Sequence, residues 1–157
     1  MVKIKIIAVG KVKEEYFTSA INEYKKRLSR YCDFSIEEVP EENYNSVNDS
    51  IIEKIKAKEE GYLLPKMVGH VFATAIEGKK YTSQAFAEKL KGLIDQGKGV
   101  ITFVIGGSYG MTDKVKKQAD ELISFSDMTF PHTFFRAMLT EQIYRAFTII
   151  DRTPYHK

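Results

Sequence analysis

The chain has 157 residues, 43% of them hydrophobic and 29% charged, which is typical of one globular domain with a sizeable core. Cys32 is the only cysteine, so a disulfide framework is excluded and a reducing compartment is favoured. Lys3 and Lys5 argue against a signal peptide, and the longest uncharged run, Gly99–Thr112, is too short and glycine-rich to span a membrane. We therefore expect a cytoplasmic protein with no membrane partner, built as a single domain over residues 1–157.

The net charge of +3 is unevenly spread along the chain. Residues 1–31 hold eight Lys or Arg and three Glu, a net charge of +5, whereas residues 33–60 hold three Lys and nine acidic residues, a net charge of −6. The basic segment suits contact with a phosphate backbone. A solvated helix face explains the same charge equally well, so charge alone leaves both interpretations open.

The first part of the chain, up to Pro65, predicts two strands that alternate with two helices. Alternation of Lys with Ile marks the first strand, and apolar residues at helical spacing mark the helices. In order, these elements are a strand over Val2–Val9, a helix over Glu14–Arg30, a strand over Phe34–Val39 and a helix that begins at Asn48, Asp49 or Ser50 and continues toward Leu64.

The rest of the chain continues the same alternation, which predicts an α/β fold with a mostly parallel sheet flanked by helices. Ser83 is the expected cap of the third helix, and Gly97 is its expected C-terminal stop. In order, the elements are a strand over Val71–Ile76, a helix over Ser83–Gln96, a strand over Val100–Ile105, a helix from Thr112 or Asp113 to about Leu122, a strand over Ile123–Phe125 and a long helix opened by Pro131.

Two predicted strands end on loops of small residues. The fourth strand stops at Gly106-Gly107, and the fifth stops at Ser126-Asp127. Ligands of open α/β sheets bind beyond the carboxyl ends of the strands. We therefore expect a single pocket between these two loops and the following helix.

Most other motifs give weaker signals. The Gly106–Gly110 loop lacks the Lys-Ser/Thr of a P-loop, and its glycine spacing is not that of a dinucleotide-binding turn. His70, His132 and His156 show no metal-ligand spacing, so no metal is expected. The C-terminal Tyr155-His156-Lys157 gathers three functional side chains, but from the residues alone a frayed tail is the simpler interpretation.

Four motifs together resemble the RlmH family of SPOUT-class methyltransferases, which act on pseudouridine in large-subunit ribosomal RNA. They are FVIGGS-x-G (Phe103–Gly110), LISFSDMTFPH (Leu122–His132), LTEQIYRAF (Leu139–Phe147) and the terminal YHK. The opening IKIIAVGKVK fits the same family, so the resemblance covers essentially the whole chain. It implies a SPOUT-type fold with a C-terminal trefoil knot, a homodimer, and S-adenosyl-L-methionine bound in the knot.

The resemblance also implies particular site residues. The cofactor contacts fall on Thr74, Gly106, Phe125, Ser126, Asp127, Met128, Thr129 and Phe130. The family usually has a larger aliphatic residue at the position of Thr74. Backbone groups can read the adenine edges while aromatic side chains cover apolar surface.

The implied reaction is methyl transfer to N3 of a pseudouridine in 23S ribosomal RNA within the ribosome. His156, from its own tail or the partner's, is the candidate for proton handling, and Tyr155 positions the base or the tail. Arg136, Arg145 and Lys157 are candidate contacts to RNA phosphates or bases. For each arginine, an ion pair on the helix surface is an equally good explanation.

Three other functions remain open at this point. One is a methyltransferase of the same class with a transfer-RNA target, and another is a non-catalytic RNA-binding or ribosome-binding protein of the same fold. The third, a nucleotide-hydrolysing enzyme, is disfavoured because a phosphate-binding lysine motif is missing.

Overall fold

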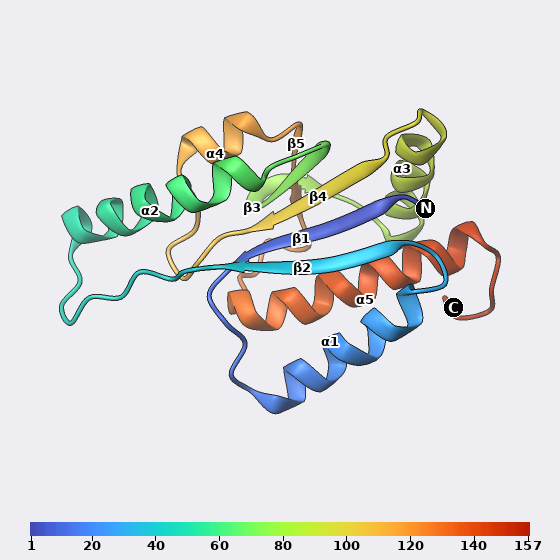
Figure 1. Ribbon diagram of the computed structural model, residues 1–157, viewed down its shortest axis with the longest axis horizontal. Helices are drawn as coiled ribbons and strands as arrows, with labels where there is room; N and C mark the ends of the chain where they lie inside the picture. Colours follow the sequence, from blue (N-terminus) through green and yellow to red (C-terminus); the bar gives the residue numbers. More distant parts are fainter.

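The computed structural model describes residues 1–157. It contains a five-stranded parallel sheet with helices on both faces (Figure 1). The strand order is β2-β1-β4-β3-β5, and all four pairings are parallel, which confirms the predicted fold class. The elements are β1 (Lys3–Val9), α1 (Glu15–Leu28), β2 (Asp33–Val39), α2 (Asp49–Leu63), η1 (Leu64–Lys66), β3 (His70–Lys80), α3 (Ser83–Asp95), β4 (Val100–Ile105), α4 (Asp113–Gln118), β5 (Glu121–Ser124) and α5 (His132–Ile150).

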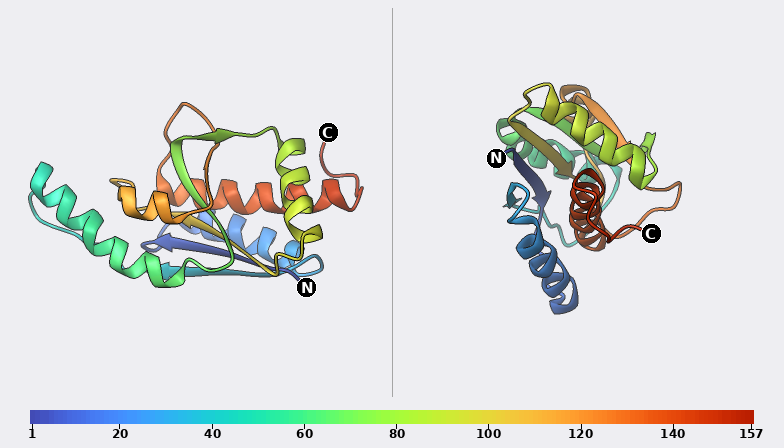
Figure 2. Two further views of the ribbon diagram at one scale, coloured as in Figure 1. Left: turned by 90° about the horizontal axis from the view of Figure 1, so that it is seen from above. Right: turned by 90° about the vertical axis from the view of Figure 1, so that its right-hand side faces the viewer.

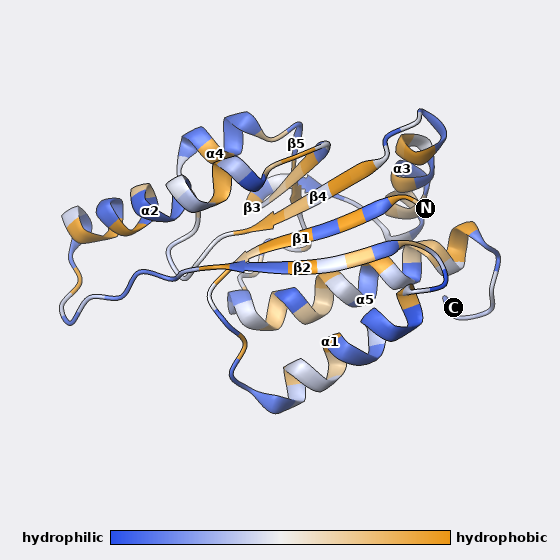
Figure 3. Cartoon of the chain, viewed as in Figure 1, coloured by the Kyte–Doolittle hydropathy of each residue, from blue (hydrophilic) through white to orange (hydrophobic).

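The alternation of side chains along β1 divides the core into two layers. Ile4 and Ile6 pack in the layer formed with α1, α3 and α5, whereas Ile7 and Val9 pack in the layer formed with α2 and α4. Figure 1 shows α1 and α5 on one side of the sheet and α2 and α4 on the other, and Figure 3 shows that apolar residues concentrate on the central strands. Because strands buried on both faces favour apolar residues throughout, β4 is apolar at every position except Thr102, whose hydroxyl donates to the Val68 carbonyl at 2.7 Å.

Two helix ends differ from the sequence prediction. Thr82, not Ser83, caps α3, because the Thr82 hydroxyl accepts a hydrogen bond from the Ala85 amide at 3.0 Å. Helix α4 ends at Gln118 and not near Leu122, because the Asp120 amide donates to the Val71 carbonyl at 2.8 Å and starts the pairing of β5. The cap of α2 is Asn48, one of the three residues expected there.

Strand β3 is longer than the predicted Val71–Ile76, because it begins at His70 and continues to Lys80. Its register with β5 shifts between Thr74 and Lys79, so the strand bends there. Gly78 lies inside this bend, where a Cβ atom would stand 2.6 Å from the backbone nitrogen of Ile123. The close approach of β3 and β5 therefore requires glycine at this position.

The two ends of the sheet carry different features. The loops after β1, β3, β4 and β5 meet at the carboxyl ends of the strands. Figures 1 and 2 show that the C-terminus lies at the opposite end, on the side of the N-terminus, and that α2 projects away from the body. None of the helices combines the length and apolar character that crossing a membrane requires.

Candidate functional site

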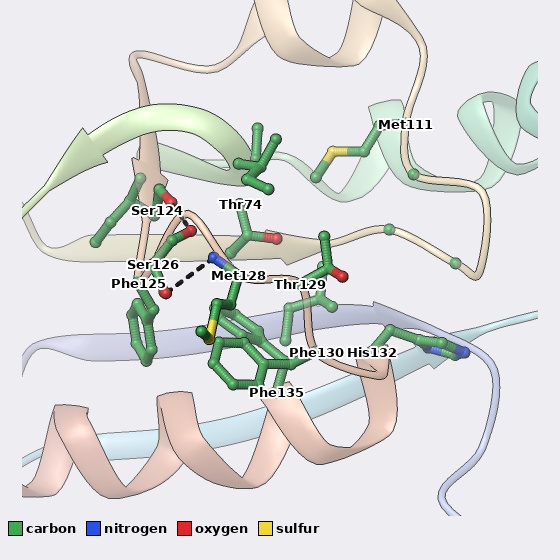
Figure 4. A pocket seen from close by; sticks show the side chains of 17 residues that line it. Thr74, Met111, Ser124, Phe125, Ser126, Met128, Thr129, Phe130, His132 and Phe135 are labelled. Atoms are coloured by element: carbon green, nitrogen blue, oxygen red, sulfur yellow. Dashed lines mark hydrogen bonds between the residues drawn. The ribbon is translucent and has the colours of Figure 1, made fainter.

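A cavity of about 170 Å³ lies where β3, β4 and β5 end, as expected from the two small-residue loops (Figure 4). Its wall comes from the end of β3, the glycine loop after β4, the loop after β5 and the first turns of α5. No Asp, Glu, Lys or Arg lines it, and His132 is its one titratable ring. The cavity is therefore suited to a ligand held by apolar contacts and backbone groups.

The glycine loop after β4 is tightly folded. The Gly110 amide donates to the Gly107 carbonyl at 3.0 Å. A Cβ on Gly106 would stand 2.9 Å from Cγ of Met111 and 3.0 Å from the carbonyl carbon of Gly110. A side chain at this position would crowd Met111 and the Gly110 backbone, so glycine keeps the turn compact and its backbone open to the cavity.

The loop after β5 is held by local hydrogen bonds of two serines. The Ser124 hydroxyl donates to the Ser126 carbonyl at 3.0 Å, and the Ser126 hydroxyl accepts from the Met128 amide at 3.0 Å. Phe125 packs against Phe135 of α5 with ring centroids 4.6 Å apart. One end of the loop is thus fixed to α5, while Met128 at its tip is 75% exposed.

The C-terminal tail is packed, and the frayed-tail interpretation is wrong. The Tyr155 phenol donates to Oε1 of Glu141 at 3.0 Å and lies 3.3 Å from the phenol of Tyr24. Its ring packs edge-on against Tyr144 of α5, with centroids 4.8 Å apart. Burial, followed by the hydrogen bonds with Tyr24 and Glu141, raises the pKa of Tyr155. The phenol therefore keeps its proton and remains a donor.

Arg145 joins the tail to α5. Its guanidinium donates to Glu141 at 2.5 Å and lies 3.0 Å from Nδ1 of His156. Because a guanidinium can only donate, Nδ1 of His156 is the acceptor, and the proton of the neutral imidazole sits on Nε2. The structure thus presents Nε2–H as the free donor of the His156 ring.

Comparison with known proteins decides the family. The family model described as "Predicted SPOUT methyltransferase" matches residues 2–156. Ribosomal RNA large subunit methyltransferase H of Limosilactobacillus reuteri is 50% identical, over 98% of this chain and 99% of its own length. Its namesake in Streptococcus uberis is 48% identical, over 99% of each chain. The chain belongs to the SPOUT methyltransferase family. The resemblance to RlmH is confirmed by these relatives.

Two solved structures share the fold of this SPOUT methyltransferase. A probable methylase family protein from Haemophilus influenzae Rd KW20 aligns with a TM-score of 0.59 and 14% identity, over 98% of this chain and 70% of its own. A probable methyltransferase from Bordetella pertussis Tohama I gives the same two values, over 92% and 94% of the two chains. At this identity the comparison shows the fold alone.

The structure of this SPOUT methyltransferase brings together seven of the eight residues expected at the cofactor. They are Thr74, Gly106, Phe125, Ser126, Met128, Thr129 and Phe130. The hydroxyl proton of Thr74 is not free to bind a ligand, because it is donated to the Val104 carbonyl at 3.0 Å. Asp127 is the exception: its side chain is 86% exposed and pairs with Lys80 outside the cavity.

Arg136 is not available to RNA in this structure, which corrects the expected substrate contact. The residue is 1% exposed, and its guanidinium donates to Glu38 at 2.5 Å and to the Gly10 carbonyl at 3.1 Å. The alternative of a surface ion pair is also wrong, because the guanidinium is buried. Arg136 instead joins α5 to the ends of β1 and β2. Lys157, by contrast, is exposed and forms no ion pair within the chain.

Sequence reasoning missed His132 as a wall residue. Its Nδ1 is buried without a hydrogen-bond partner, and its Nε2 lies 3.8 Å from Glu41. Burial lowers the pKa of His132, so the ring is neutral near pH 7. The sequence feature that could have identified His132 is its position directly after the expected cofactor loop. No group of three or more His, Cys, Asp and Glu side chains is arranged to hold a metal ion.

The cavity and the tail of one chain lie apart along α5. Phe135 lines the cavity and Arg145 holds His156, and the two residues are ten positions apart along the helix, which is about 15 Å. A second cavity of about 360 Å³ lies between, lined by Met138 and Glu141 of α5, and it shares Phe125 and Phe130 with the first. A single chain therefore does not bring His156 to the first cavity.

Proposed function

We propose that this SPOUT methyltransferase transfers a methyl group from S-adenosyl-L-methionine to N3 of a pseudouridine in 23S ribosomal RNA. It acts as a homodimer of single-domain chains, residues 1–157, in the cytoplasm and on the assembled ribosome. The C-terminal half is threaded as the trefoil knot that the family resemblance implies. The observation that carries the proposal is the cavity at the strand ends, in a chain 50% identical to a protein named ribosomal RNA large subunit methyltransferase H.

The residues of the cavity fit this cofactor. The open backbone at Gly106 and the loop Phe125–Phe130 offer amides and carbonyls to an adenine ring, and the aromatic rings cover its faces. The cavity of about 170 Å³ is smaller than the roughly 300–1,000 Å³ of typical small-molecule sites. Because Phe125 and Phe130 also separate it from the second cavity, we infer that this loop shifts when the cofactor binds.

Bound S-adenosyl-L-methionine supplies a methyl group that its sulfonium already activates, so the chemistry needs no metal. The protein then has two tasks, which are to align the uracil ring with the methyl group and to help N3 lose its proton. With the cofactor bound, N3 would lose its proton to solvent water, negative charge would spread onto the neighbouring carbonyl oxygens of the base, and transfer of the methyl group would leave S-adenosylhomocysteine. A hydrogen-bond donor or a cation at those oxygens stabilises that charge.

The tail provides such groups. His156 presents Nε2–H, and the Arg145 guanidinium behind it carries a fixed positive charge. Tyr155 fixes the tail against Glu141, and the exposed Lys157 contacts an RNA phosphate. The separation of about 15 Å along α5 argues that the tail of one chain serves the cofactor cavity of its partner. The active site is then completed only in the dimer.

A methyltransferase with a transfer-RNA target and a non-catalytic ribosome-binding protein are the competing functions. The first retains the cavity and the tail, and only the substrate separates it from the proposal. The second does not require methyl transfer at all. Both are tested by one experiment.

The experiment incubates the protein with S-adenosyl-L-methionine radiolabelled in its methyl group. The substrates are ribosomes, separated large subunits, naked ribosomal RNA and bulk transfer RNA, all from a strain that lacks this activity. Label in 23S RNA of the assembled ribosome is the expected result. Label in transfer RNA alone would overturn the substrate, and no transfer despite cofactor binding would favour the binding protein.

A further inference from the structure

Glu59 is a buried carboxylate beside the glycine loop, outside the cofactor cavity. It lies on α2 and is 3% exposed. A Cβ on Gly107 would stand 2.9 Å from Oε1 and 3.3 Å from Oε2 of Glu59, so both carboxylate oxygens lie against the glycine. The outer side of the loop therefore rests on Glu59.

The neighbouring acidic segment is attached to the same place. Oε2 of Glu59 accepts a hydrogen bond from the Glu42 amide at 3.2 Å. The Ser108 hydroxyl of the glycine loop donates to Oε1 of Glu41 at 3.3 Å. Figure 1 shows α2 passing beside the loop that follows β4. The loop thus lies between the cavity on one side and a set of carboxylates on the other.

Packing alone does not explain a carboxylate here. A buried carboxyl group costs free energy that an apolar side chain of similar volume would not. Burial, with Glu41 and Glu42 nearby, raises the pKa of Glu59 to about 7, which is the signature of that cost. The carboxyl group accepts a hydrogen bond from the Glu42 amide, and its planar face packs against Gly107. The contact on Gly107 acts directly on the loop whose backbone faces the cavity, and the bond to Glu42 holds the segment whose Glu41 accepts from Ser108 of that loop.

We propose that Glu59 is a positioning residue for cofactor binding, which fixes the Gly106–Gly107 backbone from the side opposite the cavity. The inference rests on the proposed function, because the loop that Glu59 supports is the one assigned to the cofactor. Glu59 does not line the first cavity. It acts through the glycine loop, and its effect depends on a side chain long enough to bring the carboxylate against Gly107.

The test compares two conservative variants of the full-length protein. Glu59→Asp keeps the charge but draws the carboxylate back by one methylene, whereas Glu59→Gln keeps the length and the acceptor but removes the charge. Glu53→Asp, on the exposed face of the same helix, is the matched control. Dissociation constants for S-adenosyl-L-methionine and for S-adenosylhomocysteine are measured by calorimetry, with Tm and kcat at saturating cofactor.

Glu59→Asp is expected to raise both dissociation constants about tenfold, the loss that one displaced contact brings, with kcat at saturating cofactor within about twofold. Glu59→Gln is expected to restore binding to within about threefold of wild type, and Glu53→Asp is expected to leave it unchanged. A lowered Tm with unchanged dissociation constants would show a purely structural role and overturn the inference.

Three further outcomes are decisive. Weaker binding of S-adenosyl-L-methionine but not of S-adenosylhomocysteine, in Glu59→Gln, would show that charge and not position is what Glu59 supplies, and would overturn the inference. Failure of the wild-type protein to bind either ligand would overturn the proposed function itself. Normal binding by wild type and by Glu59→Asp alike would overturn only the role of Glu59.

Discussion

Tyr155 donates a hydrogen bond to Glu141 across 3.0 Å, and this contact fastens the end of the chain to the middle of α5. The same carboxylate accepts from Arg145, whose guanidinium also contacts His156. Glu141 is therefore the common anchor of the tail. A tail held in this way is a fixed part of the protein surface, as an active-site element has to be.

The anchor gives the first prediction. Glu141→Gln removes the negative charge that two donors share, so the tail loosens and methyl transfer falls by about ten- to a hundredfold, the value of a hydrogen bond to a charged group. Cofactor binding is expected to change much less than methyl transfer, because Glu141 lines the second cavity and not the first. Deletion of Tyr155–Lys157 is expected to give the largest loss of methyl transfer: methylation is abolished, while cofactor binding is kept. Full activity of the deletion would remove the tail from the mechanism.

The second prediction concerns the dimer. Gly106→Val fills the glycine turn, where even a Cβ stands 2.9 Å from Met111, and is expected to abolish activity by closing the cofactor cavity. The tail deletion is inactive for a different reason. Mixing the two under conditions that exchange subunits restores methylation if one chain's tail serves its partner's cavity, because one site of each mixed dimer is intact. Native mass spectrometry verifies that mixed dimers form, and mixed dimers without activity would place tail and cavity in the same chain.

The third prediction separates Arg136 from Arg145. Arg136→Met leaves Glu38 and the Gly10 carbonyl without their donor, so the free energy of unfolding falls by roughly 2–4 kcal/mol. Arg145→Met lies near the surface and costs little stability, but it releases His156 and lowers kcat. Denaturant unfolding and methylation assays on both variants check this division. Reduced methylation by Arg136→Met at unchanged stability would restore it as a substrate contact.

The fourth prediction concerns pH. Burial raises the pKa of Glu59 from 4.5 to about 7, so the folded protein holds this proton more tightly than the unfolded chain does. The contribution of Glu59 to the free energy of unfolding therefore falls as the pH rises from about 4.5 to about 7. Glu59→Gln removes this dependence, and its stability relative to wild type increases across that range. Parallel stability profiles of the two proteins would contradict the assigned burial.

Much of the fold was predictable because it follows from local patterns. The apolar run of β4 and the helical spacing in α3 and α5 are set by burial, which sequence periodicity records directly. Helix ends were less predictable, because tertiary contacts decide them. The Asp120 amide ends α4 by bonding to Val71, a residue almost fifty positions away, and no local signal shows this.

The candidate site was predictable in the same uneven way. Strand ends at Gly106 and Ser126 located the cavity, because parallel strands place their carboxyl ends on one edge. The fate of Arg136 was not predictable, since an arginine on a helix looks the same in sequence whether it faces RNA or a buried Glu38. The proposed role of Glu59 was not predictable for the same reason. It depends on contact with Gly107, which is distant in sequence and is brought beside Glu59 only by the fold.

The proposed function is tested most directly by the identity of the methylated atom. Ribosomes from a strain without this activity are treated with the protein and S-adenosyl-L-methionine carrying a deuterated methyl group, and the 23S RNA is digested to nucleosides for mass spectrometry. We expect the label in a pseudouridine methylated at N3, and we expect the label to be lost when the tail is deleted. Label on another atom, or on another RNA, would contradict the proposed function.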